Sequence, residues 1–211
     1  MKRFFMALGL ALATACDSAQ EPNRTTGDSA AAPGDAATGP INTDENFNCR
    51  GTVRGTFANV FVPTGATCSL QRSTVNGNVL AREGSRLYVS DTRVAGNIDG
   101  VEARVVQVKG GSLGGSIQIA DGSSAGELGA AVYGGTVLTQ GNIKVEENSI
   151  GSSLEVAGNY VAQNIQVFKN RGTGQKSVRD NRVLQIVQCK ENTAPFVGGP
   201  NDAAEAEEQC F

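Results

Sequence analysis

Asn59-Val60-Phe61-Val62 and Asn78-Val79-Leu80-Ala81 begin a pattern that returns at close to nineteen residues along the chain. Four later segments repeat it: Asn97-Ile98-Asp99-Gly100, Ser116-Ile117-Gln118-Ile119, Ser153-Leu154-Glu155-Val156 and Asn164-Ile165-Gln166-Val167. A fixed period near twenty residues is typical of a solenoid, in which each repeat stacks on its neighbours. Because residue types alternate within the segments, we expect each to be a strand with one buried face.

Two further short apolar segments follow in each repeat. One is exemplified by Leu87-Tyr88-Val89, and the other is a single apolar residue such as Val75 or Val94. Glycines between the segments supply the bends that corners require. Three strands and three corners per repeat predict an all-β parallel β-helix of about seven turns. Helical solenoids would need long 3.6-periodic runs, which the sequence lacks.

The same register predicts the hydrophobic core as two columns of residues. The first column holds Val60, Val62, Val79, Ile98, Ile117, Ile119, Leu154, Val156, Ile165 and Val167, and the second holds Val75, Val94, Leu113, Val132, Ile150, Val161 and Val183. A polar residue precedes each first strand: Asn59, Asn78, Asn97, Ser116, Ser153 and Asn164. Stacked amides at a corner can bond from turn to turn, so we expect a structural ladder here. A stripe that binds a polar ligand is the alternative.

The N-terminus has the features of an export signal. Residues 1–15 combine a basic start, an apolar stretch too short to span a bilayer and small residues before Cys16. Leu12-Ala13-Thr14-Ala15-Cys16 resembles the lipobox of bacterial lipoproteins, which implies that Cys16 carries a lipid and anchors the chain to a membrane. Cleavage after Ala15, giving a soluble secreted or periplasmic protein, is the alternative. Residues 16–46 have almost nothing large and apolar to bury, so we expect a disordered linker.

Composition excludes some functions. The net charge of -3 gives no attraction to nucleic acid, and the absence of histidine excludes catalysis through imidazole. If Cys16 is lipidated, four cysteines remain in the body, and an even number in an exported chain suggests disulfides. Three pairings are open, of which Cys49–Cys68 with Cys189–Cys210 is favoured because the ends of a long solenoid cannot meet. Four free thiols are the alternative, and no CxxC spacing supports zinc.

The cysteine-bracketed ends, the Asn-Val/Ile-x-Val turns and the segment Asn164-Ile165-Gln166-Val167-Phe168-Lys169-Asn170 resemble the exported parallel β-helix repeat proteins of bacteria, many of them uncharacterised. The resemblance spans residues 48–210 and implies a single-stranded, right-handed β-helix, but no particular activity. We therefore expect a β-helix over residues 47–200 with disulfide-bracketed caps. Residues 201–211 differ from the family pattern, and we expect an acidic cap segment there with a helical turn.

Carboxylates are the residues that would support an enzyme of this fold. Asp99 and Glu155 are expected to face outward about three turns apart, or ~14 Å, whereas glycosidases hold their pair within about 5–9.5 Å. Two Asp/Glu–Arg pairs at corners, Asp91 with Arg93 and Glu102 with Arg104, come closest to a calcium-dependent lyase site. We expect no enzyme, cofactor or metal site, with a polysaccharide lyase as the alternative.

The remaining candidates concern binding. Phe61 and Tyr88 are expected to point outward on different faces as candidate surface-binding residues. The pattern is interrupted at residues 122–141 and 171–177, and function often lies in such insertions. The sequence predicts a non-enzymatic structural or interaction module, lipid-anchored in the cell envelope, whose partner is another envelope protein or a polysaccharide. A glycan-binding or glycan-active protein is the alternative.

Overall fold

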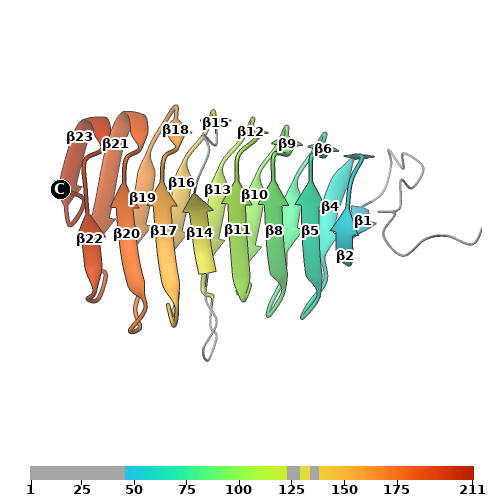
Figure 1. Ribbon diagram of the computed structural model, residues 1–211, viewed down its shortest axis with the longest axis horizontal. Coiled ribbons are helices and arrows are strands. Elements are labelled where there is room, and N and C mark those ends of the chain that lie inside the picture. Colours follow the sequence, from blue (N-terminus) through green and yellow to red (C-terminus); the bar gives the residue numbers. More distant parts are fainter. Residues whose placement is uncertain (1–45, 123–128, 134–137) are drawn as a thin grey trace, which may run out of the picture. The chain divides into compact units, whose positions relative to one another are not determined.

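Parallel strands stack coil upon coil throughout the body of the protein (Figure 1). The computed structural model describes residues 46–122, 129–133 and 138–211, which belong to one structural unit and form 23 strands. Every strand pair among them is parallel. The predicted signal peptide, Cys16 and the linker up to residue 45 lie outside the described residues.

Each coil contains an opening, a middle and a closing strand. The opening strands are β1 (Asn46–Asn48), β4 (Asn59–Val62), β7 (Val79–Ala81), β10 (Ile98–Val101), β13 (Ile117–Ala120), β16 (Ile143–Glu146) and β19 (Ile165–Phe168). The middle strands are β2 (Gly51–Val53), β5 (Thr67–Gln71), β8 (Arg86–Ser90), β11 (Val105–Lys109), β14 (Gly129–Tyr133), β17 (Ser153–Ala157), β20 (Gln175–Arg179) and β22 (Phe196–Gly198). The closing strands are β3 (Thr56–Phe57), β6 (Thr74–Val75), β9 (Arg93–Val94), β12 (Ser112–Leu113), β15 (Leu138–Thr139) and β18 (Tyr160–Val161).

Two long strands finish the solenoid. β21 (Arg182–Lys190) and β23 (Asp202–Glu208) each run through a closing position and on into the next opening position. The middle strands form an 8-stranded sheet, and the other strands join through β21 into a 15-stranded sheet. The predicted parallel β-helix is therefore confirmed, with eight middle strands where the sequence analysis expected about seven turns.

The predicted core is confirmed, because every residue of the two columns is buried. The register of four of these residues was wrong, however. Leu154, Val156 and Val132 lie in middle strands, where β17 pairs with β14. Ile150 lies in the corner between β16 and β17. The true opening strand of that coil is β16, whose Ile143 pairs with Ile117 twenty-six residues earlier.

The predicted asparagine ladder is confirmed with one exchange of residue. Along it, the side-chain oxygen of one coil accepts a hydrogen bond from a backbone N–H of the next: Asn59 from Asn78, Asn78 from Asn97, Asn97 from Ser116, Ser116 from Asn142, Asn142 from Asn164 and Asn164 from Ile186, at 2.8–3.1 Å. Asn142 occupies the place that was predicted for Ser153, which belongs to β17. The ladder is thus a feature of the fold, spanning successive coils.

The C-terminal residues form a strand, so the expected helical turn is wrong. Asp202–Glu208 is rich in Ala and Glu, which favour helices, but it pairs along β21 as β23. The open edge of β21 offers backbone partners, and tertiary context of this kind overrides a weak propensity. Gln209 then continues the stacking, since it accepts a hydrogen bond from the backbone N–H of Asn192 at 2.9 Å.

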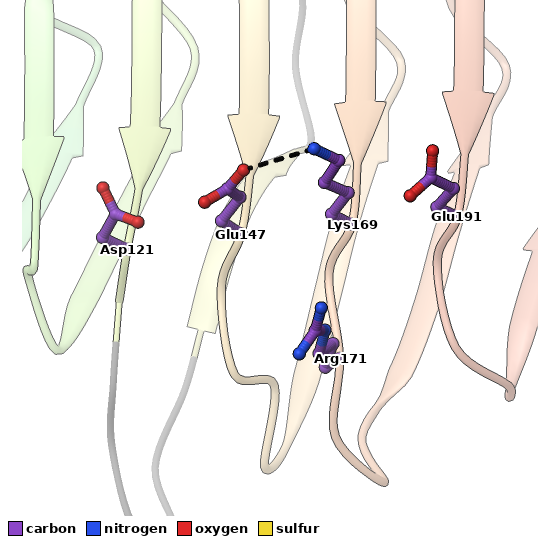
Figure 2. A pocket seen from close by; sticks show the side chains of 5 residues that line it. All are labelled: Asp121, Glu147, Lys169, Arg171 and Glu191. Carbon is purple, nitrogen blue, oxygen red and sulfur yellow. Dashed lines mark ion pairs between the residues drawn. The ribbon is translucent and has the colours of Figure 1, made fainter.

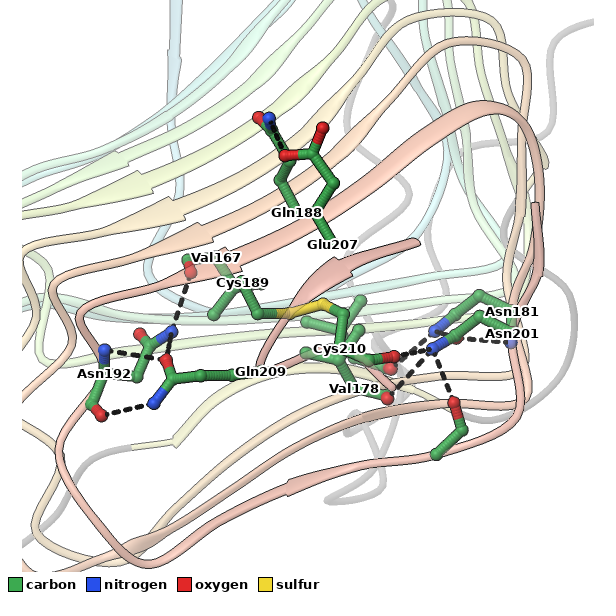
Figure 3. Close-up of a disulfide and its surroundings, with 12 residues drawn as sticks. Val167, Val178, Asn181, Gln188, Cys189, Asn192, Asn201, Glu207, Gln209 and Cys210 are labelled. Carbon is green, nitrogen blue, oxygen red and sulfur yellow. Dashed lines mark hydrogen bonds between the residues drawn. A yellow bond between two sulfur atoms is a disulfide. The ribbon is translucent and has the colours of Figure 1, made fainter. Parts of the chain in front are cut away.

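Two disulfides secure the two ends, as predicted. Cys49–Cys68 joins the first coil to the second, and Cys189–Cys210 ties the chain end to β21 (Figure 3). Their Cα–Cα distances are 5.5 and 5.2 Å, within the usual range. All four cysteines are fully buried. Disulfides of this kind are compatible with an exported, non-cytoplasmic protein.

Candidate functional site

A row of charged residues lies at the corners that follow the opening strands. Glu102, Asp121, Glu147, Lys169 and Glu191 occupy equivalent positions in successive coils, all with φ between 52° and 57°. This left-handed conformation costs a non-glycine residue about 1–2 kcal/mol. Stacking offsets the cost, because each corner N–H can donate to the neighbouring coil, as Glu147 does to the carbonyl of Phe168 at 3.0 Å. The side chains at this row face solvent.

Part of this row encloses a depression of about 390 Å³, which we call the corner pocket. Its lining residues are Asp121, Glu147, Lys169, Arg171 and Glu191 (Figure 2). Lys169 Nζ lies 3.6 Å from Glu147 Oε1, and both side chains are about half exposed. Within the part of the chain that the structure describes, no ion pair involves Arg171. The corner pocket therefore holds three carboxylates and two cations, one of them without a carboxylate partner.

A buried asparagine ladder fixes the spacing of the corner pocket. Asn148, Asn170 and Asn192 directly follow Glu147, Lys169 and Glu191 in sequence, and all three are buried. Asn148 Nδ2 donates to Asn170 Oδ1, and Asn170 Nδ2 donates to Asn192 Oδ1, each at 2.9 Å. The amides also donate to strand carbonyls of the preceding coil, for example Asn170 to Val145 at 3.0 Å. The hydrogen bonds of these asparagines thus hold the charged corner residues at a regular spacing from coil to coil.

A buried lysine holds the loop that carries Arg171. Lys176 in β20 is fully buried, in a column where the preceding coil has Leu154. Its Nζ donates to the carbonyl oxygens of Gly172 and Gly174, both at 2.9 Å. Burial lowers the pKa of this amine below its ordinary value, because the charged form loses solvation. A Cβ on Gly174 would lie 2.8 Å from Cγ2 of Ile150, so glycine is required for the loop to close over the lysine.

The sequence analysis missed Lys176 and the corner pocket. The signal for Lys176 was a charged residue at an apolar column position, twenty-two residues after Leu154. The signal for the corner pocket was the recurrence of a charged residue followed by asparagine, as in Glu147-Asn148, Lys169-Asn170 and Glu191-Asn192. Exposed carboxylates and cations that lie side by side in this way can bond the hydroxyl, carboxylate or amine groups of a polar ligand.

The two predicted surface-binding residues lie apart. Phe61 in β4 and Tyr88 in β8 belong to different sheets, and both are half-buried. The guanidinium of Arg82 lies 5.6 Å from the ring centroid of Phe61, so this ring already has a cationic neighbour. Phe61 also pairs with Leu80 on β7, which makes a small apolar spot. The structure therefore does not combine Phe61 and Tyr88 in one site.

The predicted separation of Asp99 and Glu155 along one face was wrong. Asp99 lies in opening strand β10 and Glu155 in middle strand β17, so the two carboxylates belong to different sheets. Burial raises the pKa of Asp99. Glu155 instead forms an ion pair with Arg179 at 2.8 Å on the neighbouring strand. The register error at β17 explains the mistake.

The corner carboxylates considered for calcium are exposed. Asp91 and Glu102 both occupy left-handed corner positions facing solvent. Across residues 46–122, 129–133 and 138–211, no group of three His, Cys, Asp or Glu side chains has an arrangement that could hold a metal ion. Over the same residues, no helix is long and apolar enough to cross a bilayer.

Comparisons with protein-family models, with curated proteins and with solved structures give no match to this chain.

Proposed function

We propose that this protein is a non-enzymatic interaction module of the bacterial cell envelope, held at a membrane by a lipid on Cys16. The observation that carries the proposal is the regular stacking of the coils. Outward side chains of successive coils form straight rows on two sheets, spaced by about 4.8 Å. Such rows suit an extended partner that makes many weak contacts in parallel, as in adhesion to another envelope component.

The chemistry of the body supports a scaffold. The buried asparagines are used to bond coil to coil, and both disulfides close the ends. The charged side chains of the corner pocket are exposed and partly paired with each other, which favours reversible contacts over a reaction that needs a desolvated group. The corner pocket, which is lined by charged side chains, is our candidate contact point for the partner.

Metabolic labelling with a fatty-acid probe tests the anchor. We expect the wild-type chain to be labelled and to fractionate with membranes, and Cys16→Ser to be unlabelled and released. The matched control is Cys49→Ser with Cys68→Ser, which removes two other cysteines and should leave the label in place. Unlabelled, fully soluble wild-type protein would contradict the lipid anchor and leave a secreted or periplasmic module.

Crosslinking in intact cells followed by pull-down tests the interaction. We expect a defined envelope partner whose capture is reduced by the pair Lys169→Glu and Arg171→Glu. Arg93→Glu, at an exposed position in closing strand β9 of an earlier coil, is the control. A glycan array run beside it identifies a polysaccharide partner. Turnover of a polysaccharide by the purified chain would overturn the non-enzymatic proposal.

A further inference from the structure

The two ends of the solenoid carry opposite charge. Residues 46–75, which contain β1 to β6, have three arginines and no acidic residue: Arg50, Arg54 and Arg72. Residues 191–211 contain five carboxylates and no lysine or arginine: Glu191, Asp202, Glu205, Glu207 and Glu208. The arginines are all exposed, as are the carboxylates except the half-buried Glu207. Because the coils stack in sequence order, the β1 end is basic and the β23 end is acidic (Figure 1).

The charged residues at the basic end have fewer oppositely charged partners than those at the acidic end. Within the described part of the chain, none of these three arginines has a carboxylate partner; Arg54 bonds the neutral side chain of Gln71 at 3.0 Å. At the acidic end, Lys190 contacts Glu207 and Glu208 at 3.5 and 3.1 Å, and Arg182 lies 3.6 Å from Asp202. Neighbouring coils therefore neutralise the acidic end only in part.

Among the residues that the structure describes, both ends also have strands with one unpaired edge. Among the described strands, β1, β2 and β3 each pair on one side only, and β23 pairs only with β21. An unpaired strand edge is a template for another chain. Apolar groups accompany these edges. The ring centroids of Phe47 and Phe57 lie 4.7 Å apart in the first coil, and Phe211 at the acidic end is 77% exposed.

We propose that the basic end of one copy docks on the acidic end of a second copy. Contacts between like ends are opposed by charge repulsion, whereas a head-to-tail contact brings the arginines of the first coil against the carboxylates of β23. Such a heterologous contact leaves one free end of each kind and so repeats, building a filament of one polarity. The same basic end could also contact anionic lipid, but this would not involve the acidic end.

Charge inversion at each end tests the contact. The full chain is purified in mild detergent, and its association is measured by sedimentation and electron microscopy against concentration and salt. We expect Arg50→Glu with Arg54→Glu, or Glu205→Lys with Glu208→Lys, to weaken association about tenfold or more. An equimolar mixture of these two variants should associate again, because the carboxylates introduced at the first end of one variant can then face the lysines introduced at the last end of the other. Salt should weaken the wild-type contact.

A control variant changes charges that lie outside the proposed contact. Arg93→Glu in β9 with Glu102→Lys at the corner after β10 inverts two exposed charges away from both ends and should leave association unchanged. Thermal melting checks that each variant folds, and Arg50→Gln with Arg54→Gln replaces an inversion that does not fold. The proposal is overturned if the wild-type chain stays monomeric, or if neither charge inversion changes the association. So does binding to anionic vesicles that requires Arg50 and Arg54 while no self-association occurs.

Discussion

The side-chain Oδ1 of Asn59 accepts a hydrogen bond from the backbone N–H of Asn78, 2.9 Å away in the next coil. Asn78 repeats the arrangement with Asn97 at 2.8 Å. Each amide therefore satisfies a corner N–H that no strand ladder reaches, and it sets the distance between coils at the same time. The ladder explains why asparagine recurs at this position in a sequence that otherwise varies.

Replacing one ladder residue should destabilise the whole stack. Asn78→Ala removes the acceptor for the N–H of Asn97, and we expect it to lower the free energy of unfolding by about 1–2 kcal/mol. Chemical denaturation measures the loss. Asn76→Ala is the control, since this nearby asparagine is exposed and, in the described structure, its side chain makes no hydrogen bond. Equal losses in the two variants would refute a role for the ladder.

A glycine beside the ladder should not accept a methyl group. A Cβ on Gly96 would lie 2.8 Å from the carbonyl oxygen of Gly77 and also close to Oδ1 of Asn78. Gly96→Ala should therefore cost about 1–3 kcal/mol, whereas an unhindered Gly→Ala change usually stabilises. In a double-mutant cycle with Asn78→Ala, part of the cost should disappear because one of the two clashing groups is gone. Strict additivity would show that the clash with Asn78 is absent.

The buried Lys176 should make stability depend on alkaline pH. Its pKa in the folded state is lowered from the ordinary 10.5, so between the lowered pKa and 10.5 the unfolded state binds more protons than the folded state. Wild-type stability should therefore rise as pH increases from the lowered pKa toward 10.5, when the cost of burying the charge is lost. Lys176→Met should remove this rise and be at least as stable at neutral pH. Urea unfolding at several pH values measures it.

A second substitution separates charge from volume at this site. Lys176→Ala also removes the charge but leaves a cavity in the column of Leu154, so it should be less stable than Lys176→Met by about 2 kcal/mol or more. If both variants were strongly destabilised by the same amount, the two hydrogen bonds to Gly172 and Gly174 would outweigh packing.

The end disulfides should stabilise the fold independently of the anchor. Each closes a loop of about twenty residues, for which the chain-entropy model gives about 3 kcal/mol. Cys189→Ser with Cys210→Ser should lower the melting temperature and expose β23 to proteolysis, while Cys16→Ser should leave the melting temperature unchanged. Peptide mapping without reduction checks the pairing first, and a recovered Cys68–Cys189 linkage would contradict the coil order.

Sequence periodicity could predict the coils wherever their length stays constant. Val60, Val79, Ile98 and Ile117 follow one another at nineteen residues, and all four were placed correctly. After Ile117 the spacing becomes twenty-six and then twenty-two residues. Because all three strands of a coil alternate in the same way, counting alone cannot tell an opening strand from a middle one after an insertion. Ser153–Val156 was misplaced for this reason.

The candidate site was harder to predict than the fold. The corner pocket depends on left-handed backbone at Glu147 and Lys169, where neither residue type favours that conformation. It is imposed by hydrogen bonds between coils, and these are known only once the register is known. The disulfides were predictable, by contrast, because the length of the solenoid leaves each cysteine only one partner within reach.

The Cys49–Cys68 bond also determines how the protein bears a mechanical load. A pulling force applied through the chain ahead of Asn46 would peel β1 from β4, but only three residues could detach before the force reached Cys49. From there the covalent bond passes the force directly to β5 in the second coil, whose strand is paired on both sides. Further extension would have to break the backbone hydrogen bonds of several strands at once. The disulfide in the first coil therefore prevents the strands from separating one after another.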